Sequence, residues 1–346
     1  MTGTTPGRPD QHTQQSPYIA LAPMEGLMDF HLRELITSVG GVDHCVTEFV
    51  RVNQQLYPAR VFHRYCPELD NQGKTRSGTP VHIQLLGSDP VCMAENAAKA
   101  AELGAPAIDL NFGCPAKTVN RSQGGAVLLQ YPEVLNRITA AVRQAVPKDI
   151  PVSAKMRLGY TDKSLALENA SALEAAGIQW LTVHARTKTE GYKPPAHWEW
   201  IHRIQSAVQI PVLANGEIWT PDDAALCQQH SGANLLMIGR GLVATPDLAC
   251  QIKRDHGLIQ HTDYQFQDYM RLFVDLAEQL HDLTDKILTD RLKQWLHYFS
   301  MHSAEMKRVF HAVRTYRERE SFFGALEQAL TEQSQQASGI RNHHRT

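Results

Sequence analysis

Between residues 18 and 255 the sequence repeats one unit, in which a helical pattern ends in glycine and a short apolar run follows. Three copies read AENAAKAAELGAPAIDLNFG, ENASALEAAGIQWLTVHAR and DAALCQQHSGANLLMIGRG. Glycine suits the left-handed turn that closes a helix, and the runs after it are rich in residues that favour strands. The strand candidates are YIALAPM, HCVTEFV, VHIQLLG, AIDLNFG, PVSAKMRL, WLTVHAR, PVLANGE and NLLMIGR.

Eight strands that alternate with helices predict a TIM (β/α)8 barrel over residues 18–255. A doubly wound open sheet is the alternative, but the first strand lacks the G-x-G-x-x-G turn that would favour it. After residue 260 apolar residues recur at helical spacing in DYQFQDYMRLFVDLAEQLHD, DRLKQWLHYFSMHSAEMKRVFHAV and RERESFFGALEQAL. We therefore expect a C-terminal all-α domain over residues 260–332. The polar ends, residues 1–17 and 333–346, predict disordered tails.

The composition of the 346 residues is that of a soluble globular protein, with 42% hydrophobic and 20% charged residues. No run of 18 apolar residues predicts a membrane span, and the polar N-terminus does not resemble a signal peptide. The six cysteines are scattered without a C-x-x-C pair, which argues against a disulfide framework and against a metal site. We expect a cytoplasmic protein, and a monomer.

The net charge of −2 hides a local excess of basic residues. Between residues 286 and 319, eight lysines and arginines stand against three acidic residues. Such a segment predicts a basic face on a protein that is nearly neutral overall, and a basic face suits a nucleic acid.

Polar residues follow or end most of the predicted strands. In parallel barrels the carboxyl ends of the strands form the rim that carries the active site, so this pattern points to an enzyme. The rim candidates are Met24, Glu25, Gln84, Asn111, Cys114, Lys155, Arg157, His184, Arg186, Asn215, Gly216, Glu217, Gly239 and Arg240.

The residue types alone leave several roles open. The glycines that end the seventh and eighth strands, with Arg240, predict a phosphate site, although tight turns are the alternative. Lys155 suits a Schiff base, a phosphate or a cofactor ring, and Gln84 suits either a heterocycle edge or a loop. His184 suits the site or the core. Cys114, between glycine and proline, fits a nucleophile, an acid or a buried structural thiol equally well.

Nine stretches occur in order over residues 18–245, and together they resemble the tRNA-dihydrouridine synthases: LAPMEGLMD, TEFVRV, IQLLG, DLNFGCPAKTVN, GGAVLL, KMRLG, VHART, NGEI and MIGRG. VTEFVRVNQQLYP, VFHRYCPEL and DRLKQWLHYF further resemble the bacterial subfamily that modifies uridine 16. One departure is Phe112, where relatives often have a smaller or polar residue.

The resemblance implies FMN at the barrel mouth, reduced by NADPH, with hydride passed to C6 of a uracil in tRNA. It assigns Cys114 as the catalytic acid that protonates C5. The positions that match FMN contacts are Pro23, Met24, Glu25, Gln84, Lys155, Asn215, Gly216, Glu217, Gly239 and Arg240, with His184 beside the flavin. The positions similar to tRNA contacts are Arg51, Asn111, Tyr192, Arg291, Lys293, Tyr298 and Arg314.

Two other functions compete with this interpretation. An FMN barrel that reduces a free small molecule, like dihydroorotate dehydrogenase, would share the cofactor site but would leave the basic segment without a role. A non-catalytic RNA-binding protein would use the basic segment but would need no flavin.

Overall fold

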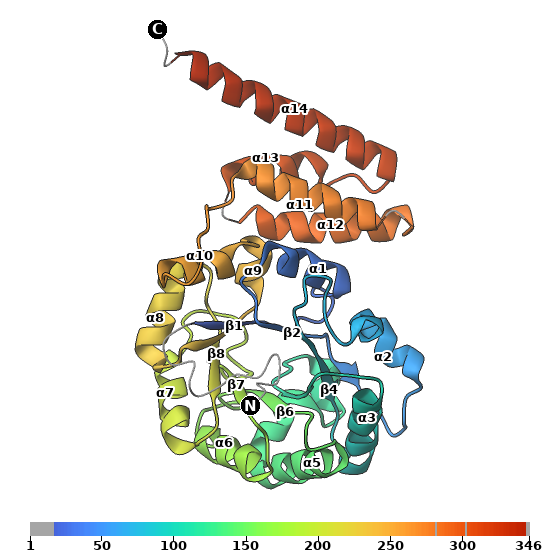
Figure 1. Cartoon of the computed structure of the whole chain (residues 1–346), viewed down its shortest axis with the longest axis vertical. Coiled ribbons are helices and arrows are strands. Elements are labelled where there is room, and N and C mark those ends of the chain that lie inside the picture. The colour runs from blue at the N-terminus through green and yellow to red at the C-terminus, as the bar shows by residue number, and fades with distance from the viewer. Residues whose placement is uncertain (1–16, 281, 302, 344–346) are drawn as a thin grey trace, which may run out of the picture. The chain divides into compact units, whose positions relative to one another are not determined.

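The strands of the computed structural model form a closed parallel barrel (Figure 1). They pair in the order β2-β1-β9-β8-β7-β6-β5-β4-β3, and a further pairing of β2 with β4 closes the ring. An open sheet has two unpaired edges, whereas a closed barrel has none. The closure therefore confirms the predicted TIM barrel and excludes the doubly wound alternative.

The structure describes residues 17–343 apart from His281 and His302. The strands are β1 (Tyr18–Leu21), β2 (His44–Val46), β3 (Val50–Arg51), β4 (Val81–Leu86), β5 (Ile108–Phe112), β6 (Val152–Arg157), β7 (Leu181–His184), β8 (Val212–Asn215) and β9 (Leu235–Ile238). The helices of this region are α1 (Phe30–Val39), α2 (Ala59–Tyr65), α3 (Pro90–Glu102), α4 (Lys117–Arg121), α5 (Pro132–Ala145), α6 (Ala166–Ala175), α7 (Trp198–Ala207), α8 (Pro221–Ser231), α9 (Arg240–Ala244) and α10 (Leu248–Asp255). Two 3₁₀ helices cover Pro67–Asn71 and Gly125–Gln130.

The second predicted strand is divided into β2 and β3, and both pieces pair with β4. Val46 lies opposite His82 and Val50 lies opposite Leu85, so the β2–β3 segment uses one residue more than β4 does. An extra residue of this kind is a bulge, which bends a strand. The Thr47 hydroxyl compensates for part of the interrupted ladder by accepting a hydrogen bond from the Gln84 N–H at 3.1 Å.

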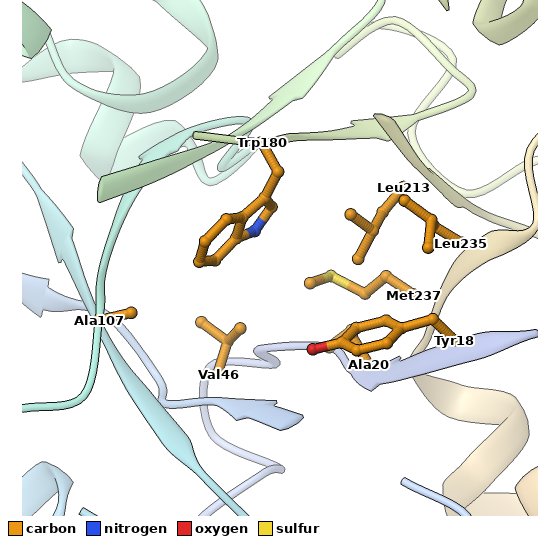
Figure 2. Close-up of a cluster of buried hydrophobic side chains, with 9 residues drawn as sticks. Tyr18, Ala20, Val46, Ala107, Trp180, Leu213, Leu235 and Met237 are labelled. Carbon is orange, nitrogen blue, oxygen red and sulfur yellow. The ribbon is translucent and has the colours of Figure 1, made fainter. Parts of the chain in front are cut away.

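Apolar side chains fill one part of the barrel interior (Figure 2). Successive residues of a strand face opposite sides, so every second residue points inward. Trp180, which precedes β7, points toward Val46 of β2 and Ala107 beside β5. Leu213 and Met237 come from β8 and β9 on the other side of the cluster. This filling makes the barrel a packed core rather than a channel.

Two stacked imidazoles are buried beside this cluster. The rings of His44 and His82 lie 4.3 Å apart at 18° to one another, and Trp180 contacts both. The Tyr18 hydroxyl lies 2.8 Å from His44 Nδ1. Burial lowers the pKa of both histidines, to about 3 for His82, because a charged imidazole is poorly solvated there. Both rings are therefore neutral near pH 7.

The C-terminal region contains four helices among the described residues: α11 (Phe266–Gln279), α12 (Asp285–Phe299), α13 (Ala304–Val313) and α14 (Arg319–His343). Their buried residues recur at helical spacing, as in Phe273 and Leu276 of α11 and Leu292, Trp295 and Phe299 of α12. This confirms the predicted all-α region. No helix of the described residues combines the length and the apolar character needed to cross a bilayer.

The chain divides into two compact units. One contains the described residues up to Gly241 together with Leu248–His261, and the other contains Leu242–Asp247 and the described residues from Thr262 onward. The predicted domain boundary at 255–260 is close to the observed boundary at His261. It does not account for Leu242–Asp247, which belongs to the second unit. Of the predicted tails, residues 1–16 and 344–346 lie outside the described residues, and residues 333–343 belong to α14.

The buried histidine pair predicts that acid destabilises the barrel. Folded His82 takes up a proton only near pH 3, whereas an unfolded histidine does so near pH 6.5, so unfolding becomes more favourable as the pH falls between these values. Each such histidine contributes a slope of about 1.4 kcal/mol per pH unit. We expect His82→Leu to reduce this slope between pH 6.5 and pH 4, measured as the free energy of unfolding in urea. An unchanged slope in both His82→Leu and His44→Leu would contradict the interpretation.

Candidate active site

The predicted rim residues come together at the carboxyl ends of the strands. Lys155 and Arg157 lie in β6, His184 ends β7, Asn215 ends β8, and Gly239 follows β9. Gln84 differs, because it pairs in register with Asp109 and lies deeper in the barrel than the residues at the strand ends. Its side chain is 0% exposed.

Four cationic side chains surround His184. The nearby charges of Arg157, Lys155, Arg186 and Arg240, together with burial as the largest cause, hold the pKa of His184 well below its usual value. The imidazole is therefore neutral at neutral pH. A rim with this many cations around a neutral ring suits an anionic ligand.

Lys155 forms no ion pair at contact distance with a carboxylate of the described residues, although the charge of Asp109 acts on it. Burial is the main reason that its pKa falls to about 8, and Asp109 opposes this effect only in part. No side chain of the described residues forms a hydrogen bond with its amine. A buried ammonium group without acceptors is costly, so the site is suited to an acceptor that arrives with a ligand.

Arg240 contacts two aromatic rings rather than an acidic residue. Its guanidinium carbon lies 4.8 Å from the ring centre of Tyr192 and 5.0 Å from that of Trp219. Within the described residues no carboxylate pairs with it, so its N–H donors remain available. Planar guanidinium donors are well matched to phosphate. This agrees with the phosphate site that the glycine-rich strand ends predict.

The backbone after β8 requires glycine. Gly216 has a φ of +118°, and a side chain there would meet the His184 ring at 2.9 Å. The next residue, Glu217, also has a positive φ of 63° and pairs with the buried Arg186. The absence of a side chain at Gly216 thus lets the His184 ring pack directly against the backbone that follows β8.

The turn that carries Cys114 is fixed at both of its backbone groups. Asn111 Oδ1 accepts hydrogen bonds from the backbone N–H groups of Gly113 at 3.0 Å and Cys114 at 2.9 Å. The Cys114 carbonyl accepts from Asn120 Nδ2 at 3.0 Å and from the Ala126 N–H at 3.1 Å. These four hydrogen bonds hold the cysteine backbone in one position.

The Cys114 thiol is buried and protonated. It is 7% exposed, and burial raises its pKa above the ordinary value for cysteine. The Ala116 N–H and the charges of Arg157 and Arg51 act in the opposite direction but do not outweigh burial. A thiol that stays protonated at neutral pH can donate a proton, whereas a nucleophile needs the thiolate. This burial argues against the nucleophile and leaves two of the three roles open, the acid and the buried structural thiol, because Cys114 also packs with Phe49, Leu86 and Val119.

Arg157 connects the cysteine turn to the loop after β7. The sequence alone does not reveal this connection. Its Nε donates to the Gly113 carbonyl at 2.9 Å, and its Nη1 donates to the carbonyls of Thr187 at 3.0 Å and Gly191 at 2.9 Å. Its guanidinium also lies over the Tyr192 ring at 5.1 Å. The partners are backbone carbonyls far away in the chain, so no local motif could reveal them.

The remaining predicted FMN contacts belong to the segment after β1. Pro23 and Met24 are partly buried and Glu25 is exposed. The Met24 carbonyl accepts the N–H groups of Leu27 and Met28, so the segment forms a turn. A side chain at Gly239 would meet Met24 Sδ at 3.1 Å, so the ends of β1 and β9 approach each other closely.

The predicted tRNA contacts are spread over separate elements. Arg51 ends β3 and donates to the Thr118 carbonyl and the Ser122 hydroxyl, beside α4. Asn111 lies in β5, and Tyr192 is 54% exposed in the loop after β7. In the helical unit, Arg291, Lys293 and Tyr298 belong to α12, and Arg314 follows α13.

Arg291 and Lys293 of α12 do not lie on one face. Arg291 and Lys293 are two residues apart, which is about 200° around a helix. Lys293 Nζ donates to the Tyr316 carbonyl at 3.0 Å and pairs with Asp290 at 3.2 Å. Arg314 is exposed. The structure therefore does not group Arg291 and Lys293 into one surface cluster.

Comparison with known proteins identifies relatives over most of the chain. The family model described as "Dihydrouridine synthase (Dus)" matches residues 20–335. The tRNA-dihydrouridine(16) synthase of Pseudomonas syringae pv. tomato is 55% identical over 86% of this chain and 94% of its own length. That of Shewanella oneidensis is 49% identical over 90% of this chain and 98% of its own length.

A solved structure shares the fold at low sequence identity. 2-Naphthoyl-CoA reductase, in complex with 2-naphthoyl-CoA, superposes with a TM-score of 0.53 at 13% identity. The match covers 68% of this chain and 50% of that chain. At this level of identity the similarity concerns the barrel fold alone.

The three carbonyls bound by Arg157 predict a large effect of Arg157→Lys. A lysine amine cannot reach all three, so charged hydrogen bonds are lost at a buried position. We expect the free energy of unfolding in urea to fall by roughly 2–4 kcal/mol and trypsin to cut faster at Lys188. The control is Arg143→Lys, since Arg143 also binds backbone carbonyls, of Val146, Pro147 and Ile150, but near the start of β6. Equal cleavage at Lys188 in both variants would contradict a specific link to the β7 loop.

Proposed function

Because the chain belongs to the dihydrouridine synthase family, we propose that it reduces uridine 16 in the D-loop of tRNA to dihydrouridine, with FMN as cofactor and NADPH as reductant. The observation that carries the proposal is the Cys114 turn, which holds a protonated thiol at a cationic barrel rim. The names of the relatives support tRNA as substrate and position 16 as the target. We further propose that it acts as a monomer in the cytoplasm.

The residues at the rim fit FMN. The donors of Arg240, with which no carboxylate of the described residues pairs, suit its phosphate. The Lys155 amine lacks an acceptor among the described residues, and a flavin ring offers acceptors at its pyrimidine edge. Gln84 is less accessible, because both ends of its amide are already bonded within the barrel.

In the proposed reaction the cofactor supplies the hydride, and the protein itself supplies one proton. When bound, FMN would carry a hydride from NADPH to C6 of the uracil. Cys114 donates the proton to C5, so that its S–H bond breaks and a C5–H bond forms, and the thiolate regains a proton from water. The charges of Arg157 and Arg51 favour the thiolate and stabilise it in the interval. Asn111 retains one amide N–H beyond its bond to Gln84, and this donor is available to the uracil.

Reduction of a base in folded tRNA requires further contacts between the protein and the RNA outside the barrel mouth. A base within a folded tRNA must leave its stack to reach a buried thiol, and contacts to the backbone stabilise that state. The basic residues between 286 and 319 are candidates for these contacts, although Lys293, Arg308 and Arg319 also pair with acidic residues of the helical unit. Arg314 is exposed and Arg291 is partly exposed.

The acid role of Cys114 predicts that Cys114→Ala abolishes most turnover. We expect the variant to keep its flavin absorbance and its affinity for tRNA, while the rate of reduction falls by about 10²–10⁴-fold, since general acids contribute that much. The measurement is mapping of dihydrouridine in tRNA from a strain that lacks the chromosomal gene and carries either form on a plasmid. Wild type should restore the modification at position 16 only.

The matched control for that experiment is Cys92→Ala, because Cys92 is partly exposed and lies in the first turn of α3 rather than in the turn after β5. It should restore position 16 as wild type does. Full modification by Cys114→Ala would remove the acid assignment. Restoration at a different position by wild type would overturn the choice of uridine 16.

A role for the basic segment predicts that Arg291→Ala/Lys293→Ala/Arg314→Ala weakens tRNA binding. Each phosphate contact releases counter-ions, so the slope of log K against log salt should become shallower by roughly two to three. Filter binding at several salt concentrations measures this slope. The control Arg137→Ala/Lys148→Ala/Arg203→Ala removes the same charge from exposed positions of the barrel unit. An unchanged slope and rate in the first variant would favour a free small molecule as substrate.

A further inference from the structure

One buried carboxylate near the site has no part in the proposed reaction. Asp109 lies in β5, two residues before Asn111, and is 1% exposed. Ser153 Oγ donates a hydrogen bond to its Oδ1 at 2.6 Å, and Gln84 Nε2 donates to its Oδ2 at 2.7 Å. Burial raises its pKa despite these two bonds. A charged or polar group in the middle of a barrel requires a physical reason to be there.

Asp109 is the start of a chain of hydrogen bonds that ends at the cysteine turn. Gln84, which donates to Asp109, accepts from Asn111 Nδ2 at 2.8 Å through its Oε1. Asn111 in turn accepts the N–H groups of Gly113 and Cys114 through its Oδ1. Side chains of β4 and β5 thus connect the carboxylate to the backbone of the proposed acid.

We propose that Asp109 is a positioning residue, which orients the amides of Gln84 and Asn111 so that an oxygen faces the backbone N–H groups of Gly113 and Cys114. The carboxylate can only accept from Gln84, so the NH₂ of Gln84 must face it and the oxygen of Gln84 must face Asn111. The NH₂ of Asn111 is then directed to Gln84, and its oxygen is left for the turn.

The opposite orientation of the two amides is unfavourable because it leaves donors facing donors. If Gln84 were reversed, its NH₂ would face Asn111, and Asn111 would reverse in turn and present its own NH₂ to two backbone N–H groups. Both bonds to the turn would be lost. Gln84 is 0% exposed and Asp109 is 1% exposed, so bulk water does not replace the missing partners.

The acceptor, rather than the negative charge, carries this role. In Asp109→Asn the amide oxygen can still accept from Gln84, while its NH₂ donates to Ser153, whose hydroxyl has the Ile108 carbonyl as an alternative acceptor. In Asp109→Leu, which has a similar shape, Gln84 has no acceptor and the orientation of both amides is no longer set. The two variants therefore separate the effect of losing the negative charge from the effect of losing the acceptor that orients the two amides.

The first measurement is amide hydrogen exchange in peptides that span residues 111–116 of the purified flavoprotein. We expect exchange at Gly113 and Cys114 to be about tenfold faster or more in Asp109→Leu, and close to wild type in Asp109→Asn. Thr182→Val is the matched control, because the Thr182 hydroxyl is buried in the same barrel without a partner among the described residues. It should leave exchange in this segment unchanged.

Gln84→Met supplies a second break in the same chain of bonds if Asp109→Leu does not fold. Methionine has nearly the same length but cannot accept from Asn111, so the same increase in exchange is expected. Exchange at wild-type rates in these two variants would overturn the proposal. The same holds for an equal increase in Asp109→Asn or in Thr182→Val.

The kinetic consequence rests on the proposed function. In Asp109→Leu we expect flavin reduction by NADPH to stay within about twofold of wild type, whereas flavin reoxidation by tRNA slows by about tenfold and recovers in Asp109→Asn. Equal slowing of both half-reactions would contradict a specific effect on the cysteine turn. If wild type does not reduce tRNA, the proposed function fails, and the exchange measurement still decides on Asp109.

Discussion

The arrangement at the barrel rim depends on one amide oxygen, Asn111 Oδ1, which accepts two successive backbone N–H groups. These two hydrogen bonds turn the chain sharply after β5 and place Cys114 beside that strand. Arg157 holds the same turn from the other side through the Gly113 carbonyl, and it carries the loop that contains Tyr192. A displacement of Asn111 would therefore move the thiol and loosen the contacts of a second loop.

Alternate residues of each strand point inward. Along the barrel axis these inward residues change from apolar to polar and then to cationic. At one level Trp180, Val46 and Met237 fill the space with apolar atoms. At the level of Asp109 and Gln84 the interior becomes polar, and these two side chains bond to each other and to Ser153 and Asn111. Near the strand ends it becomes cationic. The apolar packing thus supports a polar layer whose hydrogen bonds depend on fixed side-chain positions.

The fold could be predicted from sequence because its signals are local. A repeated unit of helix, glycine and apolar run is enough to indicate parallel strands that alternate with helices, and the closed pairing confirms the barrel. The bulge between β2 and β3 was missed, since a run such as HCVTEFV looks continuous and its extra residue is evident only against β4. The resemblance to a family added roles that spacing alone left open.

The site could be predicted only in part, because its decisive contacts are long-range. The strand ends indicated which residues reach the rim, but not that Gln84 lies one level deeper or that Arg157 binds carbonyls from two loops. The excess of lysine and arginine between residues 286 and 319 suggested a single basic face. The helical period instead separates Arg291 from Lys293, and Lys293 is bonded to Tyr316.

The protonation of Cys114 has a physical cause that local composition does not suggest. Several cations lie at the rim, and positive charge ordinarily lowers the pKa of a thiol and favours a nucleophile. Here burial outweighs the charges of Arg157 and Arg51, and Glu25 adds to the rise. In the proposed reaction the same cations would stabilise the thiolate once the proton has left. A buried thiol near cations is thus a weak acid at rest whose conjugate base is tolerated, which is the combination that a proton donor in a reduction requires.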